Sequence, residues 1–178
     1  TRAAVYHQKG DVARAVTDCD EAIRLDSKSA LAHAVRGDAR RQQGDLDGAV
    51  RDCEKAIQFD GKSALAYAAR ADVFRTQNKL ELALADCDWA LKLQPGYAFV
   101  HAVRGDVYRQ KGEPDKALAD SDAASRLDQY NGLAPSTRAA VYNRRGDFAR
   151  AVAECDRALQ LNPNNSFAYR VRGEANRS

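Results

Sequence analysis

The tetrapeptide Val-Arg-Gly-Asp occurs twice in the chain, at Val35–Asp38 and at Val103–Asp106. The two copies are 68 positions apart, which is twice 34, and a shift of 34 brings the rest of the chain into register with itself. The sequence therefore consists of internal repeats with a period of 34 residues. The aligned rows are Ala15, Ala49, Ala83, Ala117 and Ala151; Ala22, Ala56, Ala90, Ala124 and Ala158; Cys19, Cys53, Cys87, Ser121 and Cys155; and Ala3, Gly37, Ala71, Gly105, Ala139 and Gly173.

The repeat divides the chain into complete units 30–63, 64–97, 98–131 and 132–165, with a partial unit 1–29 before them and a last segment 166–178 after them. Apolar residues in each unit recur every three or four positions in two stretches, which is the period of an α-helix. Short turns such as QGD at Gln43–Asp45 separate the two stretches. Glycine suits the left-handed residue that ends a helix, and an acid suits the start of the next helix. Each unit is therefore expected to be a pair of antiparallel helices.

This pattern also explains the Arg-Gly-Asp tripeptide, which is known as a cell-adhesion signal. The first two copies are predicted to lie inside helices, where the glycine is a small contact residue. The third copy, Arg145–Asp147, falls on a turn between two helices, like QGD elsewhere. An adhesive tripeptide requires an exposed loop, so adhesion is rejected as the function.

The repeat is irregular in the segment DQYNGLAPS, residues 128–136. Pro135 falls where the first helix of unit 132–165 should already be under way, and proline is tolerated only in the first turn of a helix. We therefore expect this helix to start late, near Pro135, after a longer connection and with a local bend.

The 34-residue unit resembles the tetratricopeptide repeat. The residues that carry the resemblance in unit 64–97 are Tyr67, Arg70, Ala71, Phe74, Ala83, Cys87, Ala90 and Pro95. Two departures are systematic, because Arg replaces the usual Leu and Cys replaces the usual aromatic residue of the second helix. The Arg-Gly pair looks like that of many bacterial members. The resemblance implies an all-α fold: a right-handed superhelical solenoid over residues 1–178, with about five repeats, a terminal capping helix at 166–178 and a concave face lined by the first helices.

Composition and motifs restrict the function further. Lys and Arg number 28 against 25 Asp and Glu, a formal charge of +3, so no basic stripe for nucleic acid is expected. No apolar run approaches the ~20 residues that span a bilayer. The sequence contains no nucleophile elbow, phosphate-binding loop or metal motif, so we expect no enzyme activity and no cofactor. The chain lacks Met and begins in mid-pattern at Thr1, which indicates a fragment.

The four cysteines fall in one row of the repeat. Equivalent residues of stacked units lie about a helix diameter apart, too far for one zinc ion or a disulfide. We expect small buried thiols, which fit a reducing, cytoplasmic compartment. His33 and His101 share a column with Tyr67, which indicates packing rather than metal binding.

Two charged rows run through the repeat. The basic row is Arg2, Arg36, Arg70, Arg104, Arg138 and Arg172, and the acidic row is Asp18, Asp52, Asp86, Asp120 and Glu154. Since the basic row occupies a slot that is usually apolar, one hypothesis is a ladder of partly buried ion pairs between helices. The alternative is that the arginine heads reach out to solvent.

The resemblance also places candidate binding residues on the concave face: Leu31, Asp38, Arg41, Gln42, Leu65, Asp72, Arg75, Phe99, Asp106, Arg109, Gln110, Asn143 and Arg144. The motif Asp-x-x-Arg recurs three times there, at a spacing that lets the two side chains meet on one helix. Either these pairs satisfy each other and keep the groove soluble, or they bind a partner segment through hydrogen bonds.

The expected function is a non-catalytic scaffold that binds a protein or peptide in this groove. The alternative is a scaffold that associates with its own copies through repeat ends or outer faces. The family's clamp for chaperone tails uses Lys and Asn one turn apart. Its slots here hold Ala34 with Asp38 and Ala68 with Asp72, so a chaperone tail is not the expected ligand.

Overall fold

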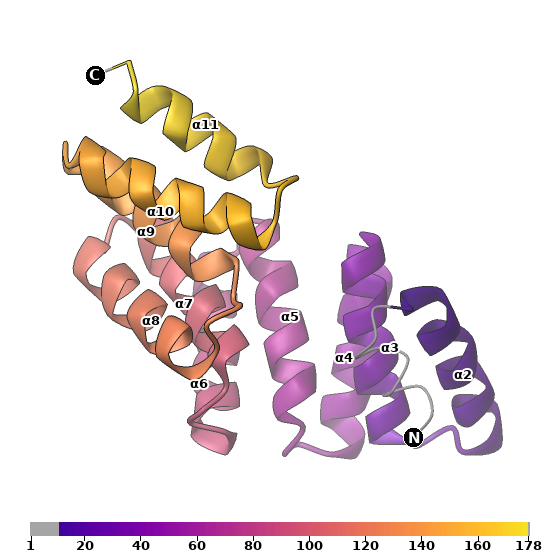
Figure 1. Ribbon diagram of the computed structural model, residues 1–178. Helices are drawn as coiled ribbons and strands as arrows, with labels where there is room; N and C mark the ends of the chain where they lie inside the picture. The colour runs from indigo at the N-terminus through magenta and orange to yellow at the C-terminus, as the bar shows by residue number, and fades with distance from the viewer. Residues whose placement is uncertain (1–10, 178) are drawn as a thin grey trace. The chain divides into compact units, whose positions relative to one another are not determined.

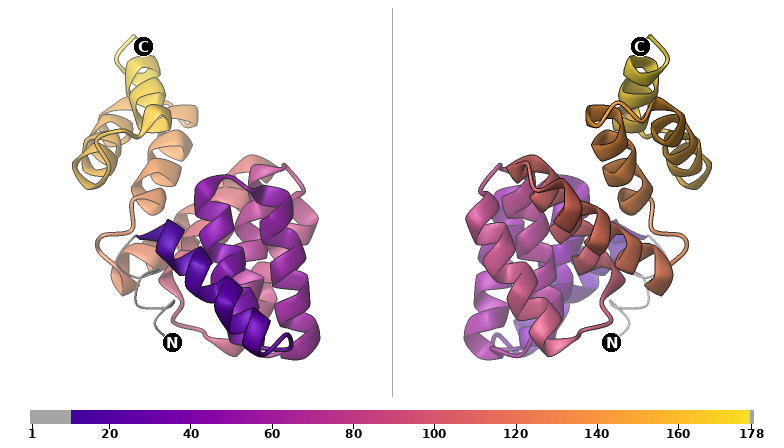
Figure 2. Two further views of the ribbon diagram at one scale, coloured as in Figure 1. Left: turned by 90° about the vertical axis from the view of Figure 1, so that its right-hand side faces the viewer. Right: turned by 90° about the vertical axis from the view of Figure 1, so that its left-hand side faces the viewer.

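The computed structural model describes residues 11–177, and this range is helical without any strand (Figures 1 and 2). The helices are α2 (Val12–Leu25), α3 (Ala30–Gln43), α4 (Leu46–Phe59), α5 (Ala64–Thr76), α6 (Leu80–Leu93), α7 (Ala98–Lys111), α8 (Pro114–Leu127), α9 (Leu133–Arg144), α10 (Phe148–Leu161) and α11 (Ser166–Ala175). Each complete unit of the sequence repeat contains two of these helices, as predicted. The described residues do not include Arg2, His7 or the rest of the first ten positions of repeat unit 1–29.

The chain forms two compact units, Thr1–Pro95 with helices α2 to α6 (unit 1) and Gly96–Ser178 with helices α7 to α11 (unit 2). Consecutive helices within each unit run in opposite directions (Figure 1). In unit 1, α3 packs against α2, α4 and α5, and in unit 2, α9 packs against α7, α8, α10 and α11. Each of α3, α5, α7 and α9 thus contacts both its own second helix and a neighbouring first helix. That the two units continue as one solenoid stays a prediction.

The turns within the repeats form where the sequence places them. Gly44, Gly112 and Gly146 have φ angles of 83°, 78° and 77°, the left-handed region that favours glycine. Asn78 occupies the equivalent position in unit 64–97 with a φ of 58°, and asparagine tolerates this region better than other residues with a side chain. The acid after the glycine caps the next helix in two of these turns. Oδ1 of Asp45 accepts a hydrogen bond from the Gly48 N–H at 2.9 Å, and Oδ1 of Asp147 accepts one from the Arg150 N–H at 3.1 Å.

Small residues let the paired helices approach closely. A Cβ atom added to Gly37 in α3 would lie 2.8 Å from the Cys53 sulfur and 3.2 Å from the Ala49 carbonyl oxygen in α4. Gly105 is similarly close to Ser121 in α8, at 3.0 Å. Both glycines belong to Arg-Gly-Asp copies, which therefore lie inside helices α3 and α7 as expected.

The irregular junction lengthens one connection. α8 ends at Leu127 and α9 begins at Leu133, whereas α4 ends at Phe59 and α5 begins at Ala64. Pro135 lies in the first turn of α9, where a missing N–H breaks no helical hydrogen bond. The side chain of Asn131 accepts hydrogen bonds from the N–H groups of Leu133 and Ala134, at 3.2 and 3.1 Å, and so stabilises the start of this helix.

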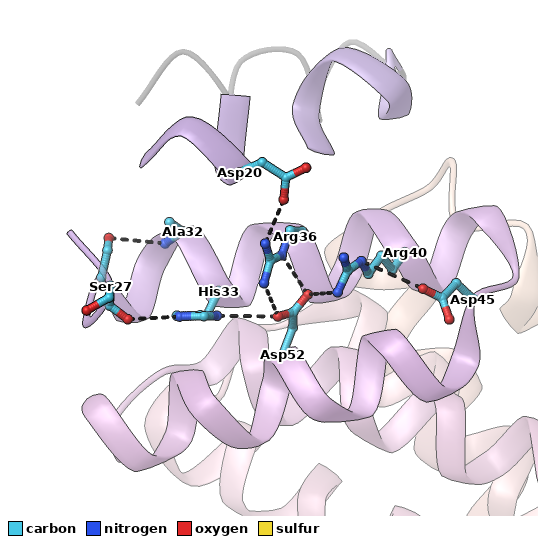
Figure 3. A network of polar contacts seen from close by, with 9 residues as sticks. Asp20, Ser27, Ala32, His33, Arg36, Arg40, Asp45 and Asp52 are labelled. Atoms are coloured by element: carbon cyan, nitrogen blue, oxygen red, sulfur yellow. Dashed lines mark hydrogen bonds and ion pairs between the residues drawn. The ribbon is translucent and has the colours of Figure 1, made fainter. Parts of the chain in front are cut away.

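The basic and acidic rows pair across the helices, as the ladder hypothesis predicts. The pairs join the first and second helix of one repeat at distances between 2.6 and 2.9 Å: Arg36 with Asp52, Arg70 with Asp86, Arg104 with Asp120 and Arg138 with Glu154. Arg36 Nη1 also donates to Asp20 of α2 at 2.6 Å, so one guanidinium holds two neighbouring helices (Figure 3). The arginines therefore do not extend freely into solvent.

Ion pairing and burial act in opposite directions on the pKa of Asp52. Burial raises it, but hydrogen bonding and charge from Arg36, with help from Arg40 and His33, lower the pKa below its usual value. Hydrogen bonding to Asp52 likewise raises the pKa of Arg36. Both groups are held in their charged forms, so the pair is a fixed part of the fold.

His33 and His101 form polar contacts in addition to packing, which extends the interpretation from the sequence that they only pack. His33 is 1% exposed, and its two ring nitrogens lie 3.3 Å from Asp52 Oδ1 and 3.2 Å from the Ser27 carbonyl oxygen (Figure 3). His101 lies 2.9 Å from Asp120 in the same way. Each ring satisfies the carboxylate already bonded to the ladder arginine, which is the arrangement that a buried polar group requires.

Candidate binding face

The sequence-predicted site residues lie on the first helices of the repeats, and we call this surface the first-helix face. It consists of α3 and α5 in unit 1, and of α7, α9 and α11 in unit 2. These helices lie side by side within their unit because each packs against the next first helix. Each unit presents its own part of the first-helix face.

In unit 1, charged side chains of the first-helix face bind one another in a chain. Asp38 accepts a hydrogen bond from Arg41 at 2.8 Å, and Asp72 accepts one from Arg75 at 2.8 Å, which confirms the intrahelical pairing predicted from Asp-x-x-Arg. Arg41 also donates to Asp72 in the next repeat at 2.6 Å. Gln42 adds a hydrogen bond to Asp38 at 3.2 Å. The carboxylates are thus saturated by neighbouring cations.

This network is mostly withdrawn from solvent. Asp38 and Asp72 are 5% and 6% exposed, and the Arg41 side chain is 18% exposed. Burial lowers the pKa of Arg41, but the charges of Asp38 and Asp72 outweigh it and leave the pKa raised. In this polar row of unit 1, formed by Asp38, Arg41, Asp72 and Arg75, each charge thus has a partner inside the protein.

The apolar site candidates differ in exposure. Leu31 is 50% exposed. Leu65 is half-buried and packs against the Ala34 and Cys53 cluster, so it belongs to the core as much as to the surface. Phe99 is half-buried, with its ring centroid 6.3 Å from that of Tyr97.

In unit 2 the polar row begins as in unit 1 and is then interrupted. Asp106 accepts hydrogen bonds from Arg109 at 2.6 Å and from Gln110 at 2.9 Å. The position 31 residues after Arg109, where Arg41 has Asp72, is Ala140. One repeat further on, Asn143 donates to Glu174 at 3.1 Å, which restores the link between repeats.

Two pockets meet at this interruption. One, of about 270 Å³, lies between α7, α9 and α11, and the other, of about 210 Å³, extends toward the start of α8. Both are lined by Arg109, Ala140 and Arg144. The larger pocket is also lined by Phe167, Arg170 and Glu174. At this position unit 2 therefore combines cations with open space.

The cations of this pocket differ in their surroundings. The guanidinium carbon of Arg109 lies 5.2 Å from the centre of the Phe167 ring, and that of Arg170 lies 5.0 Å from it. Arg170 also donates to Glu174 at 2.7 Å. Arg144 is exposed and forms no ion pair with any described residue. The pocket thus has an aromatic ring in its wall, with two guanidinium groups within cation–π distance of it.

Sequence reasoning missed the part of the first-helix face that α11 supplies. Phe167, Arg170 and Glu174 belong to the segment interpreted as a capping helix. The repeat contained the signal, because Phe167 continues the row of Leu31, Leu65, Phe99 and Leu133, and Glu174 continues the row of Asp38. Ala140 by itself gave no such signal, because the loss of a carboxylate shows only when position 140 is compared with Asp38, Asp72 and Asp106 of the other repeats.

The described range does not offer a metal site or a membrane span in place of this face. Among residues 11–177, no group of three or more His, Cys, Asp or Glu side chains has the arrangement of a metal site. Within that range, too, every helix is too short or too polar to cross a bilayer.

Comparison with known proteins agrees with this architecture. The tetratricopeptide repeat family model matches residues 2–64, 68–132 and 103–166. A search of curated protein sequences gave no match. Among solved structures, the chain is similar to TTC0263, a thermophilic tetratricopeptide repeat protein of Thermus thermophilus, with 21% identity, a TM-score of 0.75 and coverage of 99% of this chain and 96% of that one.

Two further similar structures are described as peptide-binding or peptide-bound. YrrB, described as having an unusual peptide-binding site, is 20% identical with a TM-score of 0.65, and the match covers 96% of this chain and 88% of that one. The first repeat domain of Spaghetti (RPAP3), bound to the HSP90 peptide SRMEEVD, is 21% identical with a TM-score of 0.59, covering 66% of this chain and 94% of that one. These likenesses concern the fold, and the family model covers most of the sequence. The chain belongs to the tetratricopeptide repeat family.

Proposed function

We propose that this protein is a non-catalytic scaffold that binds a segment of a partner protein on the first-helix face of unit 2. Helical-repeat proteins of this family have a fold suited to protein–protein interaction, and the similar YrrB structure is described as having a peptide-binding site. The observation that supports the location is the pair of adjoining pockets at Ala140, between α7, α9 and α11. Unit 1 offers a polar row whose charges are already paired.

The pockets suit side chains rather than a small metabolite. Volumes of about 210 and 270 Å³ lie below the ~300–1,000 Å³ typical of small-molecule sites. An extended peptide places alternate side chains on opposite faces, so neighbouring pockets fix its position while helix side chains hydrogen-bond its backbone. Asn143 and Arg144 of α9 lie beside the larger pocket and supply such groups.

The chaperone tail bound by the similar Spaghetti structure is not the proposed ligand. The clamp slots of this chain hold alanine and aspartate in place of Lys and Asn, so the groups with which the clamp grips a terminal carboxylate are absent. The peptide SRMEEVD is thus a useful negative control in a binding assay.

A library of random peptides displayed on phage tests the proposal. Peptides enriched on the immobilised protein should bind in solution, and Ala140→Trp should abolish their binding by placing a bulky ring where the two pockets adjoin. The control is Ala153→Trp, the same change at an exposed position of α10. No enrichment over an unrelated protein, or enriched peptides that bind Ala140→Trp as well as the unmodified protein, would contradict a peptide site on this face.

Self-association is a second candidate, favoured by one observation on α11. A Cβ atom added to Gly173 would have no described neighbour within 4 Å, whereas the equivalent Gly37 and Gly105 contact the second helix of their repeat. This side of α11 has room for a helix from another copy. Light scattering over a concentration series tests it, and a molecular mass that stays that of the monomer rules it out.

A further inference from the structure

We propose that the larger pocket at Ala140 binds the carboxylate of an aspartate or glutamate side chain in the partner segment, at the place where Asp72 lies against Arg41 in unit 1. This inference rests on the proposed peptide-binding function and specifies the ligand chemistry. The repeat presents the same position with an internal carboxylate, at Asp72, and without one, at Ala140.

In unit 1 the position equivalent to Ala140 is Asp72, which binds the arginine of the preceding repeat. Arg41 uses Nε for Asp38 on its own helix, at 2.8 Å, and Nη1 for Asp72 of the following repeat, at 2.6 Å. The guanidinium is therefore bonded on two edges by two carboxylates. Both bonds are charge-assisted, and the planar guanidinium presents separate donors to the two carboxylates.

Unit 2 reproduces half of this geometry. Arg109 uses Nε for Asp106 on its own helix, at 2.6 Å, as Arg41 does for Asp38. The second carboxylate is missing because position 140 is alanine. Among the described residues, no carboxylate of a following repeat is bonded to Arg109, and a pocket of about 270 Å³ adjoins its side chain.

The charges around the pocket favour an anion. Three arginines line it, Arg109, Arg144 and Arg170. Two carboxylates offset these charges. Asp106 is bonded to Arg109, and Glu174 is bonded to Asn143 and Arg170. One positive charge is therefore in excess, and Arg144 is the cation without an ion-pair partner in the described range. In unit 1, by contrast, Asp38 and Asp72 balance Arg41 and Arg75.

The wall of the pocket favours a carboxylate on a side chain rather than a free ion. The centre of the Phe167 ring lies 5.2 Å from the guanidinium carbon of Arg109 and 5.0 Å from that of Arg170. An aromatic ring offers contact to methylene groups of a glutamate while the guanidinium groups bind its oxygens. A small inorganic anion has no apolar part to contact this ring.

The experiment uses a short fluorescent peptide of alternating glutamate and leucine, acetylated and amidated so that its side chains supply every anionic group. Its partner has glutamine in place of glutamate. Anisotropy titrations at low and physiological salt should show the glutamate peptide binding about tenfold more tightly, with the difference shrinking at higher salt.

Two variants at one position separate charge from size. Ala140→Asp supplies the missing carboxylate from the protein itself and should remove the preference for glutamate. Ala140→Asn has nearly the same size and should keep the preference. Melting curves of both variants check the fold, and Ala140→Asp should melt no lower than Ala140→Asn because it gives Arg109 a second partner.

Each remaining outcome overturns the inference. Equal binding of the two peptides, failure of the glutamate peptide to bind at low salt, or equal effects of Ala140→Asp and Ala140→Asn would show that no peptide carboxylate binds there. Displacement of the peptide by inorganic phosphate at matched concentration would assign the pocket to free anions. If phage-selected peptides still require an open Ala140 but have no acid preference, the scaffold function stands and this inference alone fails.

Discussion

The guanidinium of Arg41 donates to the carboxylate of Asp72 at 2.6 Å, so a bond on the first-helix face joins two successive repeats. From sequence alone, these two residues were candidates for contacting a ligand. Their bond shows that a polar row aligned with a binding surface can instead hold the repeats together. We propose that the same row serves a ligand where one of its members is absent, at Ala140.

Breaking one rung of the ion-pair ladder should destabilise the fold. Arg70→Ala leaves Asp86, which is 5% exposed, without its two hydrogen bonds, and we expect a loss of about 2 kcal/mol in the free energy of unfolding. The double variant Arg70→Met with Asp86→Leu removes both charges and should lose less. Urea denaturation measures both.

The control for this rung is Arg51→Ala, at an exposed position of α4. It should change the unfolding free energy by less than about 0.5 kcal/mol. An Arg70→Ala variant as stable as Arg51→Ala would show that the ladder contributes nothing.

Stability should fall in acid because of Asp52. Its pKa is lowered in the folded protein, whereas the unfolded chain has an ordinary value of about 3.9. Protons therefore bind the unfolded chain more readily, and the stabilisation present above about pH 4 is lost as the pH falls through the lower folded value. Melting temperatures between neutral and acidic pH should show this loss. Asp52→Asn should melt lower at neutral pH but lose less on acidification.

The matched control is Asp47→Asn, an exposed change on the same helix. Its pH profile should follow that of the unmodified protein. If Asp52→Asn also follows that profile, the acid sensitivity arises elsewhere.

The cysteine thiols should be unreactive until the protein unfolds. Cys19, Cys53, Cys87 and Cys155 are all fully buried. Burial raises the pKa of Cys19 and Cys155 to about 11 and that of Cys53 to about 12, so little of the reactive thiolate exists at neutral pH. A chromogenic disulfide reagent should therefore report slow release at the rate of unfolding and prompt release in urea. Rapid reaction of any thiol in native buffer would show that part of the core is open.

Close approach between paired helices predicts different effects at two glycines. Gly37→Val places methyl groups against Cys53 and the Ala49 carbonyl, and we expect a loss of about 2 kcal/mol. Gly173→Val meets no described atom within 4 Å and should be nearly neutral in thermal unfolding. Similar melting temperatures for the two variants would mean that the first helices can shift away from their partners at little cost.

The sequence predicted the helices because every repeat must bury the same stripe, so the 34-residue period fixes both their ends and their contacts. It also predicted the rungs of the ladder, since an arginine in an apolar slot requires a partner and the acidic row is the nearest one. The carboxylates that bind His33 and His101 were missed because each lies on the other helix of its repeat, 19 positions away. Ala140, where we propose the ligand site, was missed because periodicity emphasises residues that recur, and this position is distinguished by a carboxylate that it lacks.

Arg36 is shared unequally between its two neighbours. Its bond to α4 ends on Asp52, whose side chain is 3% exposed, while its bond to α2 ends on Asp20, whose side chain is 54% exposed. Water can replace the second contact far more cheaply than the first. Fluctuations that detach α2 from α3 should therefore be more frequent than those that separate α3 from α4, and deuterium should enter the amides of α2 before those of α4.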